Sequence, residues 1–205
     1  MLTATLNKIY LDMHRYYIFH DGIADLKDRS NWEELLKHLG KTKADDEQLP
    51  LETLLESTGL DFALFALGGV KGYDNAIRLY ACRCAKQALS LFEKGYPGYI
   101  SPLQAIETAE RFTRGEATVA EMDAVCDTQH VGICFNISGV AYYTCEYSHG
   151  DSGPSVARSV FEIVRDTVSQ INNKTVIWDA VEADFKREFI RLCRLEGEYG
   201  EVSKF

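Results

Sequence analysis

Basic residues are scarce in this sequence relative to acidic ones. The chain has 22 lysines and arginines against 31 aspartates and glutamates, which gives a formal net charge of -9 at pH 7. Binding to a phosphate backbone requires a basic patch, so this balance argues against nucleic acid as a direct ligand. The acidic surplus instead favours docking onto a basic face of another protein, such as the groove of a nuclease. A solvated acidic surface is the plainer interpretation and stays open.

Long apolar runs are also absent. No segment approaches the roughly 20 apolar residues that a helix needs to cross a bilayer. Residues 1–22 mix Asp12, His14 and Arg15 with aromatic side chains, unlike the apolar centre of a signal peptide. We therefore expect neither a membrane span nor a signal peptide. The 46% of hydrophobic residues is in the range of a soluble globular protein.

The cysteines form no pattern of short disulfide loops. A chain of 205 residues can bury a core of its own and does not need disulfides for it. Cysteines inside helical patterns are typical of buried, reduced thiols, so we predict a cytoplasmic protein. They are Cys82, Cys84, Cys126, Cys134, Cys145 and Cys193.

No motif for catalysis is convincing. The sequence from Gly150 to Pro154 resembles the nucleophile region of trypsin-like proteases, but the chain lacks the β-barrels and the presented histidine base of that chemistry. We interpret this segment as a turn before a helix. Gly68–Gly72 lacks the spacing of a phosphate loop. Two carboxylate pairs occur in polar surroundings, where nothing would raise a pKa for acid and base work: Asp45 with Asp46, and Glu182 with Asp184.

A metal site is equally hard to build. Cys126, His130 and Cys134 are spaced four apart, so the first and last would lie about 12 Å apart along a helix. Zinc holds its ligands within about 2.3 Å, so the three cannot share one ion. A pair with a distant ligand such as His149 stays open, but we favour small thiols at a helix contact. We predict no metal, no cofactor and no enzymatic activity.

Helical periodicity is the clearest signal in the sequence. From Asp74 onward apolar residues recur at steps of three and four, and Pro97 with its flanking glycines ends this helix. Capping boxes predict the start of the next two helices: Ser101 with Gln104, and Thr118 with Glu121. Small residues then continue to about Cys145, which predicts a helix kinked near Gly132 or Gly139. Further helices are expected over 156–171 and 176–195.

The N-terminal part is less regular. Residues 2–19 predict a helix, with a strand possible for the last part, and Ser30 with Glu33 predicts a helix that ends at Gly40. Residues 41–48 are polar and predict a mobile linker. Two short helices follow, LETLLES and DFALFAL, the second capped by Asp61.

These patterns together predict an all-α protein. The expected architecture is an antiparallel multi-helix array with short loops. We predict an N-terminal helical segment with a charged linker over 1–48 and a helical domain over 49–205.

Tyrosine supplies the candidate binding surface. The chain has 11 tyrosines, and a rigid ring with a polar tip is favoured at recognition surfaces. They could equally cap the edges of the core. The predicted partner-binding residues are the cluster Tyr142, Tyr143 and Tyr147, together with Glu146, Tyr96 and Tyr99.

The block IRLYACRCAKQALSLFEKGYPG, followed by SPLQAIETAERFTRGEAT, resembles a bacterial and bacteriophage family of alanine-rich helical proteins labelled immunity proteins (Imm-5-like). Two sets of residues carry the likeness: Tyr80, Cys84, Ala85 and Lys86, then Ala105, Ile106, Glu107, Ala109, Glu110 and Gly115–Thr118. LETLLESTGLDFALFALGGV and DFKREFIRLC extend it to about residues 50–195. Residues 1–48 have no counterpart. The resemblance implies a non-enzymatic binder in conflict between microbes, or between phage and host.

Three functional hypotheses follow. The first is a cytoplasmic inhibitor that binds and blocks a partner protein, such as a toxin or nuclease, through an acidic, tyrosine-rich surface. The second is a phage anti-defence factor, such as an anti-CRISPR protein. The third is a structural homo-oligomer, since small-residue helix faces can also serve a homodimer. An enzyme would be favoured only if His130 and His149 lay beside a carboxylate in a deep pocket.

Overall fold

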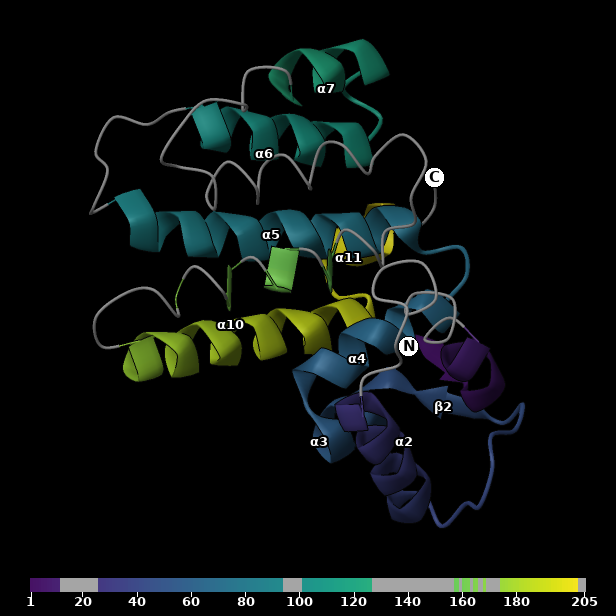
Figure 1. Ribbon diagram of the computed structural model, residues 1–205. Coiled ribbons are helices and arrows are strands. Elements are labelled where there is room, and N and C mark those ends of the chain that lie inside the picture. The colour runs from purple at the N-terminus through teal and green to yellow at the C-terminus, as the bar shows by residue number, and fades with distance from the viewer. Residues whose placement is uncertain are drawn as a thin grey trace. The chain divides into compact units, whose positions relative to one another are not determined.

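The computed structural model describes residues 1–11, 26–93, 101–126 and 174–202, and positions 157, 158, 160–162, 164, 165 and 168 (Figure 1). The chain divides into two compact units, Met1–Gly72 and Tyr73–Phe205. Each unit has buried apolar residues of its own. Within the described ranges, no helix combines the length and the hydropathy that crossing a membrane requires. The all-α class is confirmed, with a small two-stranded sheet as an addition.

The sheet joins the start of the first unit to residues 48–50. Strand β1 (Thr3–Thr5) pairs antiparallel with β2 (Gln48–Pro50), and Ala4 lies opposite Leu49. The prediction of a helix from residue 2 is therefore wrong for its first residues, and helix begins only at residue 6. Two β-branched threonines favour a strand there, and the partner strand lies too far along the chain for local periodicity to reveal it. The rest of that prediction, over residues 12–19, falls outside the described residues.

Helix α2 (Leu26–His38) begins before Ser30, so the predicted start at the Ser30 capping box is wrong. Its end at Gly40 is confirmed: Gly40 has φ 66°, and its N–H donates to the carbonyl of Lys37. The two short helices are also confirmed as α3 (Leu51–Thr58) and α4 (Leu60–Ala66), followed by the 3-10 turn η1 (Leu67–Gly69). The α4 cap is Gly59, and Asp61 lies in the first turn instead.

The polar segment after α2 has no helix or strand over residues 41–47, but it is held by side chains. Lys41 forms ion pairs with Asp45 and with Glu47. Asn7 donates from its backbone to the carbonyl of Asp45 and from its side chain to Asp46, at 3.0 Å in both cases. The Lys41 hydrogen bond lowers the pKa of Asp45. The carboxylates of Asp45 and Asp46, one of the two pairs noted in the sequence, therefore accept bonds from Lys41 and Asn7 that hold this segment.

The division between the units follows Gly72, whereas the expected boundary follows residue 48. Strand β2 comes directly after residue 47 and pairs with β1, and α3 packs against both α2 and α4. Residues 48–72 therefore complete the core of the N-terminal unit. The strand pairing across more than 40 residues of chain is what brings them there.

The second unit is built around α5 (Asp74–Glu93), which lies between α6 (Ser101–Thr113) and α10 (Lys174–Arg194) and runs antiparallel to both (Figure 1). Helix α7 (Val119–Cys126) packs on α6, and α11 (Glu198–Val202) packs on α5. These helices confirm the predicted antiparallel array, while α11 was not predicted. The Thr118 capping box is confirmed, because the Thr118 N–H donates to Glu121 at 2.8 Å and the Glu121 N–H donates to Thr118 Oγ1 at 3.3 Å.

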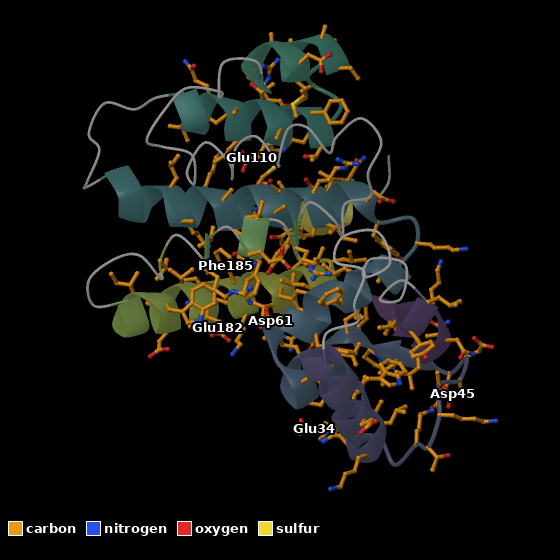
Figure 2. The ribbon with its side chains drawn as sticks, in the orientation of Figure 1. Glu34, Asp45, Asp61, Glu110, Glu182 and Phe185 are labelled. Carbon is orange, nitrogen blue, oxygen red and sulfur yellow. The ribbon has the colours of Figure 1, made fainter. Side chains whose placement is uncertain are left out.

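Helix α5 is buried on two sides because its inward residues are small. Ala81, Ala85 and Ala88 have almost no exposed surface, so neighbouring helices can approach its backbone closely. Larger rings fill the α10 side, where Tyr80 meets Phe189 edge to face at 5.9 Å and Phe185 lies between α5 and α10 (Figure 2).

The described positions between 157 and 168 are helical, as predicted for 156–171. Their buried residues follow the helical period: Ala157, Val160, Phe161, Val164 and Val168. The predicted kink near Gly132 or Gly139 falls outside the described residues.

Three helices end in the same backbone motif. After α6, the Gly115 N–H donates to the carbonyl of Phe112 and the Glu116 N–H donates to that of Arg111. The corresponding bonds follow α2 and α10, and all three place one residue in the left-handed region. Gly40 and Gly115 occupy that position in α2 and α6, but Leu195, with φ 54°, occupies it after α10. A leucine there carries a strain of about 1–2 kcal/mol that glycine avoids.

We predict opposite effects for two substitutions at this position. Gly115→Ala should lower the free energy of unfolding by about 1 kcal/mol, and Leu195→Gly should raise it by up to about 1 kcal/mol, because the left-handed strain is added in one case and removed in the other. Urea unfolding followed by circular dichroism measures both. If the Leu195→Gly variant is less stable than the Gly115→Ala variant, Leu195 does not carry the proposed left-handed strain.

Candidate functional site

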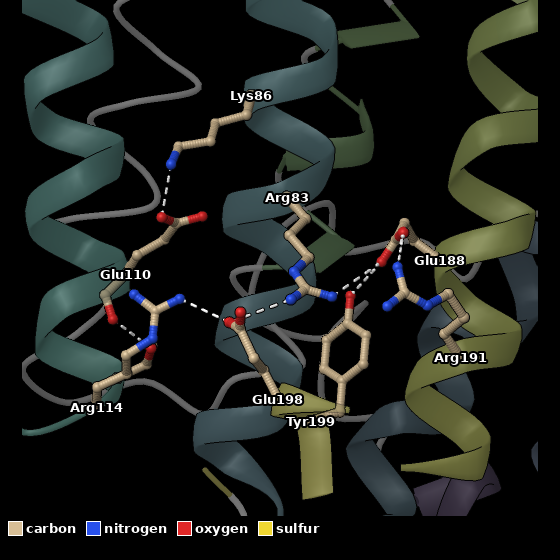
Figure 3. Close-up of polar contacts among 9 residues, drawn as sticks. Arg83, Lys86, Glu110, Arg114, Glu188, Arg191, Glu198 and Tyr199 are labelled. Atoms are coloured by element: carbon tan, nitrogen blue, oxygen red, sulfur yellow. Dashed lines mark hydrogen bonds and ion pairs between the residues drawn. The ribbon is translucent and has the colours of Figure 1, made fainter. Parts of the chain in front are cut away.

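Charged side chains from four parts of the second unit meet near the chain's C-terminal end (Figure 3). They come from α5, from the turn after α6, from α10 and from α11. We call them the C-terminal network: Arg83, Arg114, Glu188, Arg191, Glu198 and Tyr199.

Glu188 is the centre of this network. It is only 7% exposed, and its Oε2 accepts a hydrogen bond of 2.7 Å from the Tyr199 hydroxyl. Arg191, one turn along α10, donates to Oε1 at 2.6 Å. Arg83 of α5 approaches Oε2 at 3.5 Å. A buried carboxylate needs such partners to offset its lost hydration, and here they come from three helices.

Glu198 forms the second node. Its Oε2 lies 2.7 Å from Arg114 Nη2 and 3.2 Å from Arg83 Nη2, so one carboxylate bridges two arginines. The Arg83 guanidinium also lies over the Tyr199 ring, 4.6 Å from its centre. Arg83 thereby contacts both carboxylates and the aromatic ring between them.

The network keeps both carboxylates ionised at neutral pH. Burial by itself would raise the pKa of Glu188, but the hydrogen bonds from Tyr199 and Arg191 and the nearby guanidinium charges outweigh it and lower that pKa. The Arg114 hydrogen bond lowers the pKa of Glu198. Burial, and then the Glu188 charge, raises the pKa of Tyr199, which therefore stays a neutral donor. Paired in this way, the carboxylates act as structural acceptors.

A separate ion pair lies on the other side of α5. Lys86 Nζ reaches Glu110 Oε2 of α6 at 2.6 Å, and Figure 2 places Glu110 between these two helices. Cys82 lies one turn before Lys86 and so on this side of α5, whereas Cys84 lies one turn after Tyr80, which meets Phe189 of α10. Burial raises the pKa of both thiols.

The three cysteines that the structure describes with their side chains, Cys82, Cys84 and Cys193, are free and buried. Among described residues, no group of three or more histidines, cysteines or acidic residues is arranged to hold a metal ion. The other carboxylate pair singled out in the sequence, Glu182 and Asp184, forms ion pairs within α10, to Lys186 and Arg187.

The sequence-predicted binding residues lie outside the part of the chain that the structure describes, so their grouping stays a prediction. Tyr96, Tyr99, Tyr142, Tyr143, Glu146 and Tyr147 all fall outside it, as do His130, Cys134, His149 and the segment 150–154. Conversely, sequence reasoning missed the C-terminal network. Its members are spread from residue 83 to residue 199, and no local motif marks them.

The fold and this network define a helical array in which charged side chains join the helices. Residues 74–130 match a family described as "Imm-5 like putative immunity protein". The match confirms the family resemblance over that segment, which contains α5, α6 and α7. No curated protein and no solved structure matches the chain.

We predict unequal costs for removing two glutamates of α10. Glu188→Ala should lower the free energy of unfolding by about 2–4 kcal/mol, because it leaves the buried Tyr199 hydroxyl without its acceptor and takes one carboxylate from Arg83 and from Arg191. Glu182→Ala is the matched control: it removes a more exposed pair with Lys186 and should cost less than about 1 kcal/mol. Denaturant unfolding of both variants measures these losses. If Glu188→Ala lowers the free energy of unfolding no more than Glu182→Ala does, the network does not stabilise the fold.

The lowered pKa values predict a loss of stability in acid. In the folded protein Glu188 and Glu198 titrate below 4.5, the ordinary value for glutamate, so between the two values the unfolded chain binds more protons. Their contribution is complete above pH 4.5 and is lost as the pH falls through the folded-state values. Melting temperatures recorded from pH 7 downward should show this fall, and Glu188→Gln should make it shallower. An identical acid profile in the variant would contradict the pairing.

Proposed function

We propose that this chain is a non-enzymatic, immunity-type protein that binds a partner protein and blocks its activity. The observation that carries the proposal is the family match over residues 74–130. Within the described residues, the strongest cluster of ionisable groups is the C-terminal network, whose members are used in holding helices together. That arrangement supports a role in binding rather than in catalysis.

The matched segment presents an acidic surface that suits this role. On α6, α7 and the turn between them, the exposed charged residues include one base, Arg111, and that base is already held by Glu121 at 3.0 Å and by the carbonyl of Glu116 at 2.9 Å. We call the exposed acids the acidic surface: Glu107, Glu116, Glu121 and Asp123. Val119 beside them is 49% exposed, so an apolar contact adjoins the charges.

A partner for this surface would carry a basic face. Opposite charges across an interface speed association and select the partner, and they lose strength as salt is added. A toxin or nuclease whose active groove is basic fits this description. The tyrosines at 96, 99, 142, 143 and 147, together with Glu146, remain our proposed partner contacts. The buried free thiols support a cytoplasmic site of action.

Affinity capture followed by an activity assay tests the proposal. The tagged full chain should retain a specific protein from host lysate at low salt and release it at high salt. Adding the purified chain should then inhibit the activity of the captured protein in proportion to the amount bound. Failure to retain any specific protein, or retention without inhibition, would count against the proposed function.

The acidic surface can be tested by charge removal. Glu107→Gln with Glu116→Gln should slow association with the captured partner by roughly three- to tenfold and flatten its salt dependence, because electrostatic steering acts mainly on the association rate. Glu34→Gln with Asp179→Asn removes the same charge from exposed positions elsewhere and serves as the control. Equal slowing in both double variants would show that only the total charge matters. Surface plasmon resonance measures these rates.

The same acidic surface also favours a second candidate, a phage anti-defence factor such as an anti-CRISPR protein, because defence nucleases carry basic grooves for nucleic acid. Plaque assays on strains that carry single defence systems separate the two.

A homodimer stays a prediction, and exposed small residues of α7, Ala120 and Ala124, offer it a contact. Light scattering of the purified chain measures that state.

A further inference from the structure

Helix α11 is a short element that is attached mainly by side chains. It has five residues, far fewer than an isolated helix needs to be stable, so it depends on its docking against α5. Side chains make the attachment: Tyr199 and Val202 are buried and Tyr199 donates to Glu188, while Glu198 bridges Arg83 and Arg114. If either attachment weakens, little backbone structure holds α11 in place.

The connection to α10 has the properties of a hinge under strain. Between the helices, Leu195 and Gly197 both adopt left-handed backbone angles, with φ 54° and 59°. Leucine carries a cost there that opening of the turn would relieve. Gly200 of α11 also packs tightly, since a Cβ built at that position would lie 2.8 Å from the Leu195 carbonyl oxygen. The docked position of α11 therefore tolerates no side chain at Gly200.

Beneath Tyr199 lies the buried α10-facing side of α5. Tyr80 and Cys84 are each 1% exposed and lie one turn apart on α5, where Tyr80 meets Phe189 of α10 at 5.9 Å. Tyr199 packs against Arg83, the residue before Cys84, and donates to Glu188, the residue before Phe189, so it lies close to this side. Cys82, two residues away on the same helix, is equally buried, but it lies one turn before Lys86, which pairs with Glu110 of α6 at 2.6 Å. We therefore expect removal of α11 to let solvent reach Cys84 before Cys82.

We propose that α11 is a strap that detaches as a unit about the Leu195–Gly197 hinge and exposes the Tyr80 and Cys84 side of α5, while α5, α6 and α10 stay folded. Local openings of this kind occur where an element is short and has few buried contacts of its own. The inference is independent of the proposed function, because it concerns only the second unit's own contacts.

Thiol labelling of the native full chain tests the strap. A maleimide reagent at neutral pH, followed by unfolding, digestion and mass spectrometry, gives separate rates for Cys84 and Cys82. Tyr199→Phe removes the hydrogen bond to a charged acceptor and should raise the Cys84 rate roughly tenfold. Gly200→Ala, which leaves every charged group in place, should raise it by a similar factor, while the Cys82 rate changes less than about twofold in both variants.

Cys82 is the internal control because global unfolding would expose both thiols together. Selective acceleration at Cys84 in both variants supports the strap. Equal acceleration at Cys82 and Cys84 would overturn it, since the variants would then only promote global unfolding. Unchanged Cys84 labelling in both variants would overturn it as well, because α11 would not be what covers that thiol.

Discussion

The buried carboxylate of Glu188 is the constraint on which the arrangement of the second unit depends. A charge that is 7% exposed must find partners, and those partners come from α5, α10 and α11. Helix α11 is consequently held where the Tyr199 hydroxyl can reach Oε2, and α5 where Arg83 can contact both carboxylates. Apolar packing brings these helices together, and that packing must also place the partners of Glu188 within reach of its carboxylate.

Helix α5 makes this arrangement possible because it can be buried on two sides. Small residues along it admit α6 and α10 at close range, and the two sides then differ in chemistry. One side carries the Lys86 to Glu110 pair beside Cys82, and the other carries Arg83 with its two carboxylates beside Cys84. The segment that matches the immunity family thus contains both the central helix and the outward α6 and α7 acidic surface.

Local patterns predicted the helices well wherever a helix carries its own start and stop signals. The Thr118 capping box, the helix that begins at Asp74 and the end of α2 at Gly40 are all present as expected, since each depends on residues within one or two turns. The same reasoning failed at Thr3–Thr5 and at Ser30. The first joins a strand that is distant in the sequence, and the second lies inside a helix that starts earlier.

The features of the second unit likewise fall into those that follow from local sequence and those that depend on the fold. By itself the sequence determined the all-α class, most helix limits, the acidic charge and the likeness to immunity proteins, because these follow from composition and from neighbours along the chain. Only the tertiary structure decided that Glu188 meets Tyr199 and Arg83, that Glu198 bridges two arginines, and that β1 pairs with β2. Such contacts join residues far apart in the chain, and a polar residue's partner is settled by which helices pack together and not by its neighbours in sequence.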